Sequence, residues 1–415
     1  MWQFEPSLKI VIVHNTYRQP GGEDTVVSAE KDLLSQAGNE VREYLRHNTE
    51  INPGGTCSNI ALGMRTVWSA SSRNELSRLI RECKPDIAHF HNTFPLISPA
   101  AYYACRDFGV PVVQTLHNYR LFCSAATFFR EGKICEDCLG KGRWQAVRHA
   151  CYRQSRSASA TVVAMLSFHH WYGTWTKLVD CYIALSEFSR TKFIDAGLPV
   201  EKIVVKPNFV LPDPGVGRGL RENAVYLGRL SEEKGLRTLL KAWAQVNPSF
   251  TLHIIGDGPM LVEIRSQITR SGLSNVRLEG RLSREASLKV LQSARVVILP
   301  SSCYENCPMT SAEAFACATP VIASCLGALE EIVHDGRTGL HFRPGDAEDL
   351  ARKIEWALAH PNEMFEMGQN ARAEYEKKYT AEGNYKMLMD IYKRAIQQRT
   401  KALKFQDKTA VRVAD

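Results

Sequence analysis

The sequence lacks any apolar run of the length that a helix needs to cross a lipid bilayer, about 20 residues. Residues 1–5 also lack the basic start and apolar stretch of a secretory signal peptide. These absences predict a cytoplasmic protein. In that compartment, the twelve cysteines are expected to be thiols or metal ligands rather than disulfides.

Two further absences concern chemistry. No Asp-x-Asp sequence occurs, so a diphosphate bridged to carboxylates by a metal ion is not indicated. No lysine motif indicates a pyridoxal site. With 415 residues, 44% of them hydrophobic and 23% charged, the chain has the composition of a soluble protein and a length that favours two domains.

Apolar strands alternate with helical segments in both halves of the chain. Alternation of this kind predicts parallel βαβ units. Strands are expected at 8–14, 40–45, 86–91, 112–117, 181–185, 224–228, 251–255, 276–279, 296–299 and 321–323. The sequence therefore predicts an α/β fold of two doubly wound domains facing each other across a cleft. Ligands of such sheets bind at the carboxyl ends of the strands.

Composition also divides the chain. Prolines and glycines cluster around residues 207–219, which is the pattern of a linker. The expected parts are an N-terminal domain (1–207) with a Cys-rich insertion (118–157), a linker (208–222), a C-terminal domain (223–380), and a C-terminal segment (381–415). This last segment is a helix with a tail, and the helix either crosses back to the first domain or does not.

Glu305 and Glu313 bracket the junction between the apolar strand at 296–299 and a helix that is expected to begin at Pro308. Proline suits the first helical position, where its missing N–H costs nothing. The junction combines free N–H groups at a positive helix end, which bind anions, with two carboxylates. A ligand with both phosphates and hydroxyls, such as a nucleotide sugar, suits that combination.

Basic and glycine-rich loops follow other strands of the second half. Arg229 and Lys234, in the loop 228–235, can neutralise a departing diphosphate, although each alone is more typical of a surface charge. Gly256 and Gly258 permit close backbone approach to a ligand, and they equally fit an ordinary tight turn.

The first half offers candidate contacts to the same ligand. Gly21 and Gly22 precede a helix, so their N–H groups either face phosphates or belong to a capping turn. His117 ends a strand, where it either points into the ligand crevice or is a structural histidine. His89 and His91 end a neighbouring strand, and they too either point into the ligand crevice or are structural histidines.

The insertion at 118–157 is basic, with eight Lys/Arg against three Asp/Glu, within a chain of net charge +8. Its four cysteines fit tetrahedral zinc or are scattered buried thiols: Cys123, Cys135, Cys138 and Cys151. Four cysteine ligands leave no open coordination position on zinc, so we expect a structural metal ion rather than a catalytic one. Because the insertion directly follows His117, we expect it to form a lid over the acceptor side. A zinc-bearing nucleic-acid-binding protein is the alternative class, but it gives the two glutamates no role.

The segment 158–176 is apolar and aromatic and is expected to be helical. It carries Phe168, Trp171, Tyr172 and Trp175 beside the basic insertion. These side chains belong either to the core of the first domain or to a surface that rests on an anionic membrane.

Residues 224–345 resemble the nucleotide-binding domain of family 4 retaining glycosyltransferases, which have the GT-B fold. The matching motifs are GRL…KG at 228–235, GDGP at 256–259, E-x7-E at 305–313, PVIAS at 320–324 and EIV-x-DG-x-TG at 331–339. The first half matches more thinly, through Gly21-Gly22 and Thr115-Leu116-His117.

The resemblance implies roles for these residues. Arg229 and Lys234 would grip the donor diphosphate, and Glu313 would accept hydrogen bonds from the ribose. Glu305 would hold the donor sugar, and His117 would contact that sugar from the acceptor side. The donor site so implied comprises Gly21, Gly22, Arg229, Lys234, Gly256, Gly258, Glu305, Asn306, Met309, Thr310 and Glu313.

The resemblance further implies a hexosyltransferase that moves a sugar, with retention, from a UDP-, GDP- or ADP-linked donor to a glycan or lipid-linked acceptor in cell-surface polysaccharide synthesis. It implies no catalytic divalent metal and no nucleic acid, and a place in the cytoplasm or on the inner face of the membrane. Within the same fold, a nucleotide-sugar epimerase or a phosphorylase-like enzyme is the alternative. The missing pyridoxal motif weakens the phosphorylase reading.

Overall fold

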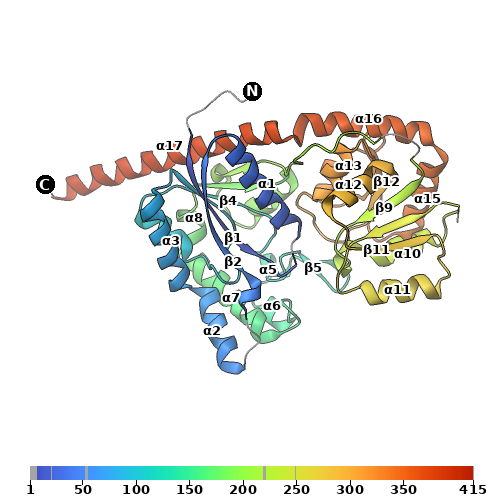
Figure 1. Ribbon diagram of the computed structural model, residues 1–415. Helices are drawn as coiled ribbons and strands as arrows, with labels where there is room; N and C mark the ends of the chain where they lie inside the picture. Colours follow the sequence, from blue (N-terminus) through green and yellow to red (C-terminus); the bar gives the residue numbers. More distant parts are fainter. Residues whose placement is uncertain (1–6, 20, 52–54, 218–220, 248, 415) are drawn as a thin grey trace.

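The computed structural model describes residues 7–19, 21–51, 55–217, 221–247 and 249–414. The expectation about a signal peptide at residues 1–5 lies outside the described residues, as do residues 218–220 of the expected linker. The described chain forms two parallel six-stranded sheets, each flanked by helices, side by side (Figure 1). The prediction of two doubly wound α/β domains is thereby confirmed.

The first sheet has the strand order β2-β1-β3-β4-β7-β8. Its strands are β1 (Lys9–Thr16), β2 (Glu40–His47), β3 (Ile87–Asn92), β4 (Val112–Thr115), β7 (Cys181–Ala184) and β8 (Ile203–Val205). Its helices are α1 (Gly22–Gln36), α2 (Thr56–Val67), α3 (Ala70–Cys83), α4 (Ala101–Asp107), α7 (Arg156–Trp171), α8 (Thr174–Lys177) and α9 (Glu187–Asp195).

The second sheet has the order β11-β10-β9-β12-β13-β14. Its strands are β9 (Asn223–Leu227), β10 (Leu252–Ile255), β11 (Val276–Gly280), β12 (Ala294–Leu299), β13 (Val321–Ser324) and β14 (Gly339–Phe342). Its helices are α10 (Leu236–Trp243), α11 (Leu261–Arg270), α12 (Arg284–Ser293), α13 (Met309–Ala316), α14 (Ala328–Ile332) and α15 (Ala347–Ala359).

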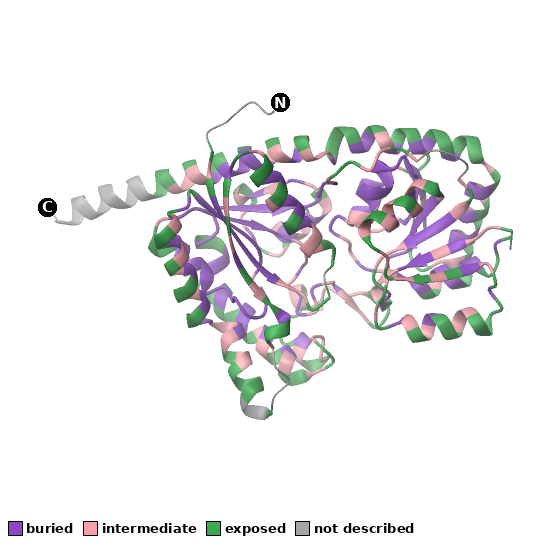
Figure 2. Cartoon of the chain, in the orientation of Figure 1, coloured by how far each residue is buried: buried purple, intermediate pink, exposed green. Residues whose placement is uncertain are grey.

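Both sheets are covered on their two faces, which explains the near-continuous apolar runs in their central strands. In β1, Ile10, Val11, Ile12 and Val13 are all buried, and in β12 so are Val296, Val297 and Ile298. Figure 2 shows these strands as buried cores beneath helices with exposed outer faces. The carboxyl ends of the strands are therefore the places where loops can carry functional side chains.

Two helices close the chain and connect the halves. After α16 (Pro361–Lys378), the helix α17 (Ala381–Ala414) runs back along the first half and packs against α1, β4 and β7 (Figure 1). The helix α17 continues through Ala414, over residues for which the sequence predicted a tail. No helix within the described residues combines the length and apolarity needed to traverse a bilayer.

The insertion contains a two-stranded hairpin, β5 (Phe129–Arg130) with β6 (Lys133–Ile134), and the short helices α5 (Asp137–Gly140) and α6 (Gln145–Arg148). Several elements lay outside the sequence prediction, among them α2, α4, α9, α14, β8 and β14, because each is short or lacks a clear apolar period. The strand expected at 112–117 ends at Thr115, and Pro308 is the N-cap of α13 rather than its first residue.

Candidate active site

Lys234 and Glu305 form an ion pair at the carboxyl ends of β9 and β12. Lys234 Nζ lies 2.6 Å from Glu305 Oε1, and Ser301 Oγ donates to the same oxygen at 2.6 Å. Burial alone would lower the pKa of Lys234, but the neighbouring Glu305 carboxylate raises it above its ordinary value. The lysine is therefore a fixed cation beside the loop that opens α13.

Gly235 explains how Lys234 comes to lie there. It follows the 3-10 turn that contains Lys234 and has a left-handed backbone, with φ of 71°. A Cβ atom at Gly235 would lie 1.8 Å from the carbonyl oxygen of Pro300, at the end of β12. Only glycine permits this close approach, which places the lysine next to the loop carrying Glu305.

Arg229 lies on the same loop and is exposed. Within the described residues, its side chain forms no ion pair, whereas its carbonyl oxygen accepts a hydrogen bond from Tyr226. The structure thus brings Arg229 and Lys234 to one loop and leaves only Lys234 neutralised by a protein carboxylate.

Glu313 lies inside α13, as expected, with its side chain 10% exposed. Its carboxylate lies 3.3 Å from Arg284 Nε, and Arg284 also donates to the carbonyl oxygen of Leu211. Burial raises the pKa of Glu313, and Arg284 opposes that rise. The sequence interpretation had missed Arg284, which stands at the first position of another helix, α12.

A cavity of about 660 Å³ opens beside Arg284. It is lined by Asp24, Thr25, Ser28, Ala29, Asp32 and Gln36 of α1, by Leu211 and Pro212, and by Arg284. The cavity therefore lies between the first helix of one half and α12 of the other. Its size is that of small-molecule and cofactor pockets.

Gly256 and Gly258 have a structural reason to be glycine. A Cβ atom at Gly256 would lie 1.9 Å from the carbonyl oxygen of Gly228, and one at Gly258 would lie 2.4 Å from that of Leu230. The two loops also share a hydrogen bond from Leu230 N to Asp257 O. These glycines let one loop pack on the other, so the close backbone approach that requires glycine here is to a neighbouring loop.

The N-terminus of α1 faces the N-terminus of α13. A Cβ atom at Gly22 would lie 3.7 Å from Met309 Cγ, whereas one at Gly21 would meet no atom within 4 Å. The Gly21 N–H donates to the carboxylate of Asp24 at 2.8 Å, which is a capping interaction. Gly22 and Met309 thus come together from opposite halves, and Gly21 has space beside it.

His117 lies just beyond β4 and is half-buried. Its Nε2 atom is 2.9 Å from His91 Nδ1, and the two rings stack with their centroids 5.2 Å apart. Burial lowers the pKa of His117 well below its ordinary value, as do the neighbouring histidines. His89 is fully buried and hydrogen-bonded to Thr115, so it fits the structural reading.

One hydrogen bond joins the two halves next to His117. The Asn306 side chain donates to the carbonyl oxygen of Leu116 at 3.3 Å. Because Leu116 precedes His117 and Asn306 follows Glu305, the two loops are direct neighbours. Thr310 donates to the carbonyl oxygen of Leu227, which ties α13 to the end of β9.

The insertion approaches the same loop from the first half. The Phe128 ring lies 6.4 Å from that of Tyr304, the residue before Glu305. Lys192 Nζ lies 2.8 Å from the carboxylate of Glu136 within the insertion. The insertion therefore stands beside the cleft, on the side of the first domain.

The cysteines of the insertion are neighbours, but their sulfur atoms are not close enough together to coordinate one metal ion. Burial raises the pKa of Cys138 to about 12, and the other three cysteines contribute to that rise. A tetrahedral site with Zn–S bonds of about 2.3 Å would place the sulfurs roughly 4 Å apart. No three of Cys123, Cys135, Cys138 and Cys151 have their sulfur atoms within 4.8 Å of one another. Structural zinc stays a prediction.

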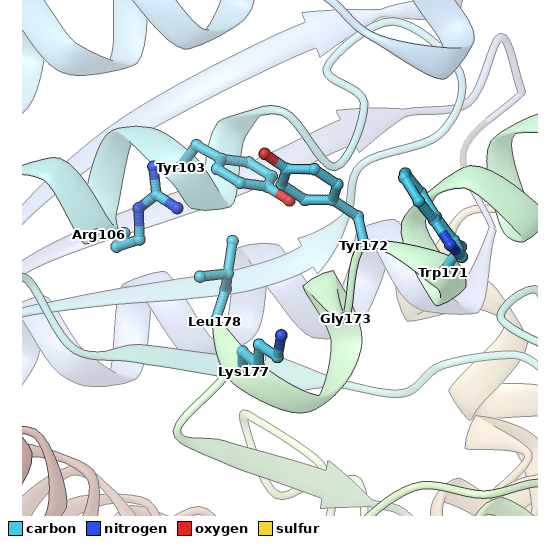
Figure 3. Close-up of a pocket in the computed structure, with 7 residues that line it drawn as sticks. All are labelled: Tyr103, Arg106, Trp171, Tyr172, Gly173, Lys177 and Leu178. Carbon is cyan, nitrogen blue, oxygen red and sulfur yellow. The ribbon is translucent and has the colours of Figure 1, made fainter.

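A second cavity, of about 400 Å³, lies away from these residues, between α4 and the α7–α8 junction. Figure 3 shows Tyr103 and Tyr172 side by side, with Arg106 and Lys177 flanking them. Trp171 borders the cavity and is 81% exposed. Trp175, by contrast, is buried. The segment 158–176, expected as one helix, is divided between α7 and α8 by the left-handed Gly173, and it belongs partly to the core and partly to an aromatic, cationic surface.

The sequence interpretation also missed a buried charge near the cleft. Glu30 of α1 is 1% exposed and lies close to His89, His91 and Lys206. The available signal was its position, since Glu30 shares the apolar face of α1 with Val26, Val27, Leu33 and Leu34. A carboxylate on a buried helix face must have polar partners.

Two family models match the chain. The model described as Glycosyl transferases group 1 matches residues 219–374, and the one described as Glycosyltransferase Family 4 matches residues 21–213. The first covers the sheet that carries Glu305 and Glu313. The second runs from just before α1 to beyond β8 and includes His117, but it leaves out β1.

Curated relatives share about a quarter to a third of their residues with the chain. The 2-deoxystreptamine glucosyltransferase of Streptomyces kanamyceticus is 26% identical, over 72% of this chain and 75% of that protein. The sulfoquinovosyl transferase of Arabidopsis thaliana is 31% identical, over 72% of this chain and 54% of that protein. An uncharacterized glycosyltransferase of Methanocaldococcus jannaschii is 28% identical, over 49% of this chain and 56% of that protein. The chain thus matches little more than half the length of the last two relatives.

Solved structures share the fold over nearly the whole chain. HepE of Anabaena, in complex with UDP and glucose, has a TM-score of 0.65 and 18% identity, covering 92% of this chain and 98% of its own. Sucrose-phosphate synthase of Thermosynechococcus elongatus has a TM-score of 0.67 and 20% identity, covering 93% of this chain and 98% of its own.

Proposed function

We propose that this chain, which has the GT-B fold, is a glycosyltransferase that transfers a hexosyl group with retention from a nucleotide sugar to a glycan or lipid-linked acceptor. The observation that carries this proposal is the ion pair between Lys234 and Glu305 beside the N-terminus of α13. Asn306, the residue after Glu305, donates to Leu116, the residue before His117, so the loop that carries Glu305 adjoins the loop that carries His117 on the opposite half. A cation, a carboxylate and an imidazole from three loops thus surround the place where a sugar diphosphate would react.

The roles in donor binding follow from charge and position. Arg229 and Lys234 neutralise the diphosphate, whose charge grows as it departs. Glu305 accepts hydrogen bonds from the sugar, and the backbone N–H groups at Asn306, Met309 and Thr310 donate hydrogen bonds to the donor. Glu313 accepts hydrogen bonds from the ribose and is held for that purpose by Arg284.

The reaction needs no group beyond donor, acceptor and these side chains. The bond between the anomeric carbon and the diphosphate oxygen breaks, and its electron pair leaves with the diphosphate. The acceptor oxygen attacks the anomeric carbon from the same face, and its proton passes to the departing phosphate oxygen. The fixed cations favour this step because they meet charge that is larger in the transition state than in the ground state.

The acceptor side of the proposal rests on the first half. The insertion at 118–157 stands beside the loop before Glu305, which suits a lid over the acceptor. The exposed Trp171 and the cations Arg106 and Lys177 suit contact with an anionic membrane that presents a lipid-linked acceptor in polysaccharide synthesis. We accordingly place the enzyme in the cytoplasm, peripheral to the membrane.

A ligand screen tests the proposal in two stages. UDP, GDP and ADP are first compared by thermal shift, since a ligand at a hundred times its Kd stabilises the folded state by about 2.7 kcal/mol. Sugars linked to the stabilising nucleotide are then incubated with the enzyme, and NMR identifies the first anomer released or transferred. We expect one nucleotide to stabilise the protein and the donor configuration to be kept.

Other outcomes of this screen distinguish the alternatives. Release of the opposite anomer would refute the retaining mechanism. Conversion of the nucleotide sugar to an epimer would identify an epimerase of the same fold. Stabilisation by none of the three nucleotides would overturn the donor site itself.

A further inference from the structure

A buried carboxylate lies beneath His117. Glu30 Oε2 is 3.2 Å from Lys206 Nζ, while Glu30 Oε1 is 2.9 Å from His89 Nδ1 and 3.4 Å from His91 Nε2. Burial alone would raise the pKa of Glu30, but Lys206 and His89 hold it well below its ordinary value. Glu30 is therefore an anion that faces two histidines inside the first domain.

Glu30, His89 and His91 have the composition of a metal-binding set, with one ligand atom from each within 4.8 Å of the others. The charge balance argues against a metal ion. Lys206 already neutralises Glu30, so a divalent cation would leave two positive charges uncompensated in a fully buried place. A hydrogen-bonded chain through neutral imidazoles needs no additional charge.

The position of the proton on each imidazole of this chain follows from the ionised carboxylate of Glu30 at one end. Within the described residues, neither His91 Nε2 nor Glu30 Oε1 has a partner with hydrogen-bond geometry, and the two atoms lie 3.4 Å apart. A lone pair on His91 Nε2 would face the ionised carboxylate at this distance, so electrostatics favour the proton on His91 Nε2 and the lone pair on His91 Nδ1. The pKa of His91 is lowered to about 3, chiefly by burial, so this ring carries a single proton at neutral pH.

The same logic extends to His117. His91 Nδ1 lies 2.9 Å from His117 Nε2 and, as the acceptor, requires the proton to be on His117 Nε2. His117 Nδ1 then carries a lone pair. Within the described part of the chain, Nδ1 has no protein partner, and the half-buried ring borders the cleft next to Asn306.

We propose that Glu30 acts through His91 as a positioning residue that fixes His117 in the Nε2–H tautomer, so that His117 offers Nδ1 as a hydrogen-bond acceptor to a hydroxyl of the bound sugar. The sugar contact rests on the proposed transferase function, whereas the tautomer does not. The His91 and His117 ring planes lie within 25° of each other, with centroids 5.2 Å apart, which is compatible with an in-plane hydrogen bond between the two nitrogens.

Three variants separate the chain from general packing. His91→Phe keeps a ring but removes both nitrogens. Glu30→Gln/Lys206→Met removes both charges together, because Glu30→Gln alone would leave Lys206 buried without its counter-charge. Tyr392→Phe is the matched control: Tyr392 is equally buried and bonds His89 at 2.8 Å, but it lies outside the path to His117.

The tautomer is read from the ¹⁵N shifts of histidine-labelled protein, with His117→Gln assigning the resonances. We expect an unprotonated Nδ1 on His117 in the wild-type protein and in Tyr392→Phe. We expect a protonated Nδ1 to appear in both other variants. A protonated Nδ1 in the wild-type protein, or an unchanged His117 in both variants, would overturn the proposal. So would one equivalent of bound metal that Glu30→Gln/Lys206→Met removes.

Activity gives the second measurement once the donor is known. The kcat/KM for the donor should fall about tenfold in His91→Phe and in Glu30→Gln/Lys206→Met, because one hydrogen bond to the sugar is weakened. It should stay within about twofold in Tyr392→Phe. An equal loss in all three would show a merely structural role. Absence of turnover in the wild-type protein would count against the proposed function alone, since the NMR result does not depend on a substrate.

Discussion

Substitution of Lys234 should lower both stability and turnover, whereas substitution of Arg229 should lower turnover alone. Lys234 is 27% exposed and Glu305 is 12% exposed, and their charges lie 2.6 Å apart. Lys234→Met keeps the aliphatic stem but leaves the Glu305 carboxylate with Ser301 as its remaining donor on Oε1. A hydrogen bond to a charged group contributes about 1.5–3 kcal/mol. The free energy of unfolding should fall by about this amount.

In a domain of this size, that loss corresponds to a Tm lowered by about 3–12 °C. Arg229→Met should leave Tm unchanged, because the side chain is exposed and has no carboxylate partner within the described residues. Both variants should lower kcat, by about a hundredfold or more, since each removes a cation that meets the departing diphosphate.

Scanning fluorimetry without ligand and initial-rate kinetics with a confirmed donor measure the two effects separately. Lys241→Met is a suitable control, because it removes a lysine from the exposed face of α10. The reasoning fails if Arg229→Met destabilises the protein as much as Lys234→Met does. It also fails if Arg229→Met keeps full kcat.

Four other expectations follow from the same structure. Glu313→Ala should raise KM for the donor by about tenfold or more through lost ribose hydrogen bonds, and an unchanged KM would remove Glu313 from the donor site. Acid should destabilise the fold: the pKa of His91 falls from 6.5 in the unfolded chain to about 3 in the folded one, so the unfolded chain takes up the proton first. The contribution of His91 to the free energy of unfolding is fully present above about pH 6.5. It declines by up to about 1.4 kcal/mol for each pH unit between about pH 6.5 and about pH 3. Denaturation midpoints at pH 7, 5 and 4 measure it, and a flat profile contradicts it. Metal analysis of the purified protein should find about one zinc for the four cysteines of the insertion, and less than about a tenth of an equivalent with all thiols free would refute structural zinc. The protein should co-sediment with anionic liposomes, and Trp171→Ala should weaken that binding; failure of the wild-type protein to bind would exclude membrane docking through this surface.

The alternation of strands and helices was enough to predict the fold. Parallel strands place their carboxyl ends at one edge, so the loops with Lys234 and Glu305 were expected to meet there. The structure brings them into direct contact. The extra elements, such as α4 and β14, carried no periodic signal long enough to be recognised.

Partners far apart in the chain could not be predicted. Glu30 and Lys206 are separated by 176 residues, and Arg284 lies 29 residues from Glu313. A single sequence does not indicate which charges meet, because each pair is set by how whole helices pack. The reason for the glycines at 256 and 258 could not be predicted from the sequence either, because the atoms that they must avoid lie in another loop.

The contact of α17 with the first domain bears on the order in which the protein can be made. The Lys206 ammonium bonds the Asn384 side chain at 2.9 Å, and the Asn384 amide donates to the Pro207 carbonyl at 2.7 Å. Asn384 emerges from the ribosome 178 residues after Lys206. Domains usually fold as they appear, beginning at the N-terminus. Here the first domain must wait until α17 has been synthesised before its buried ammonium acquires this partner.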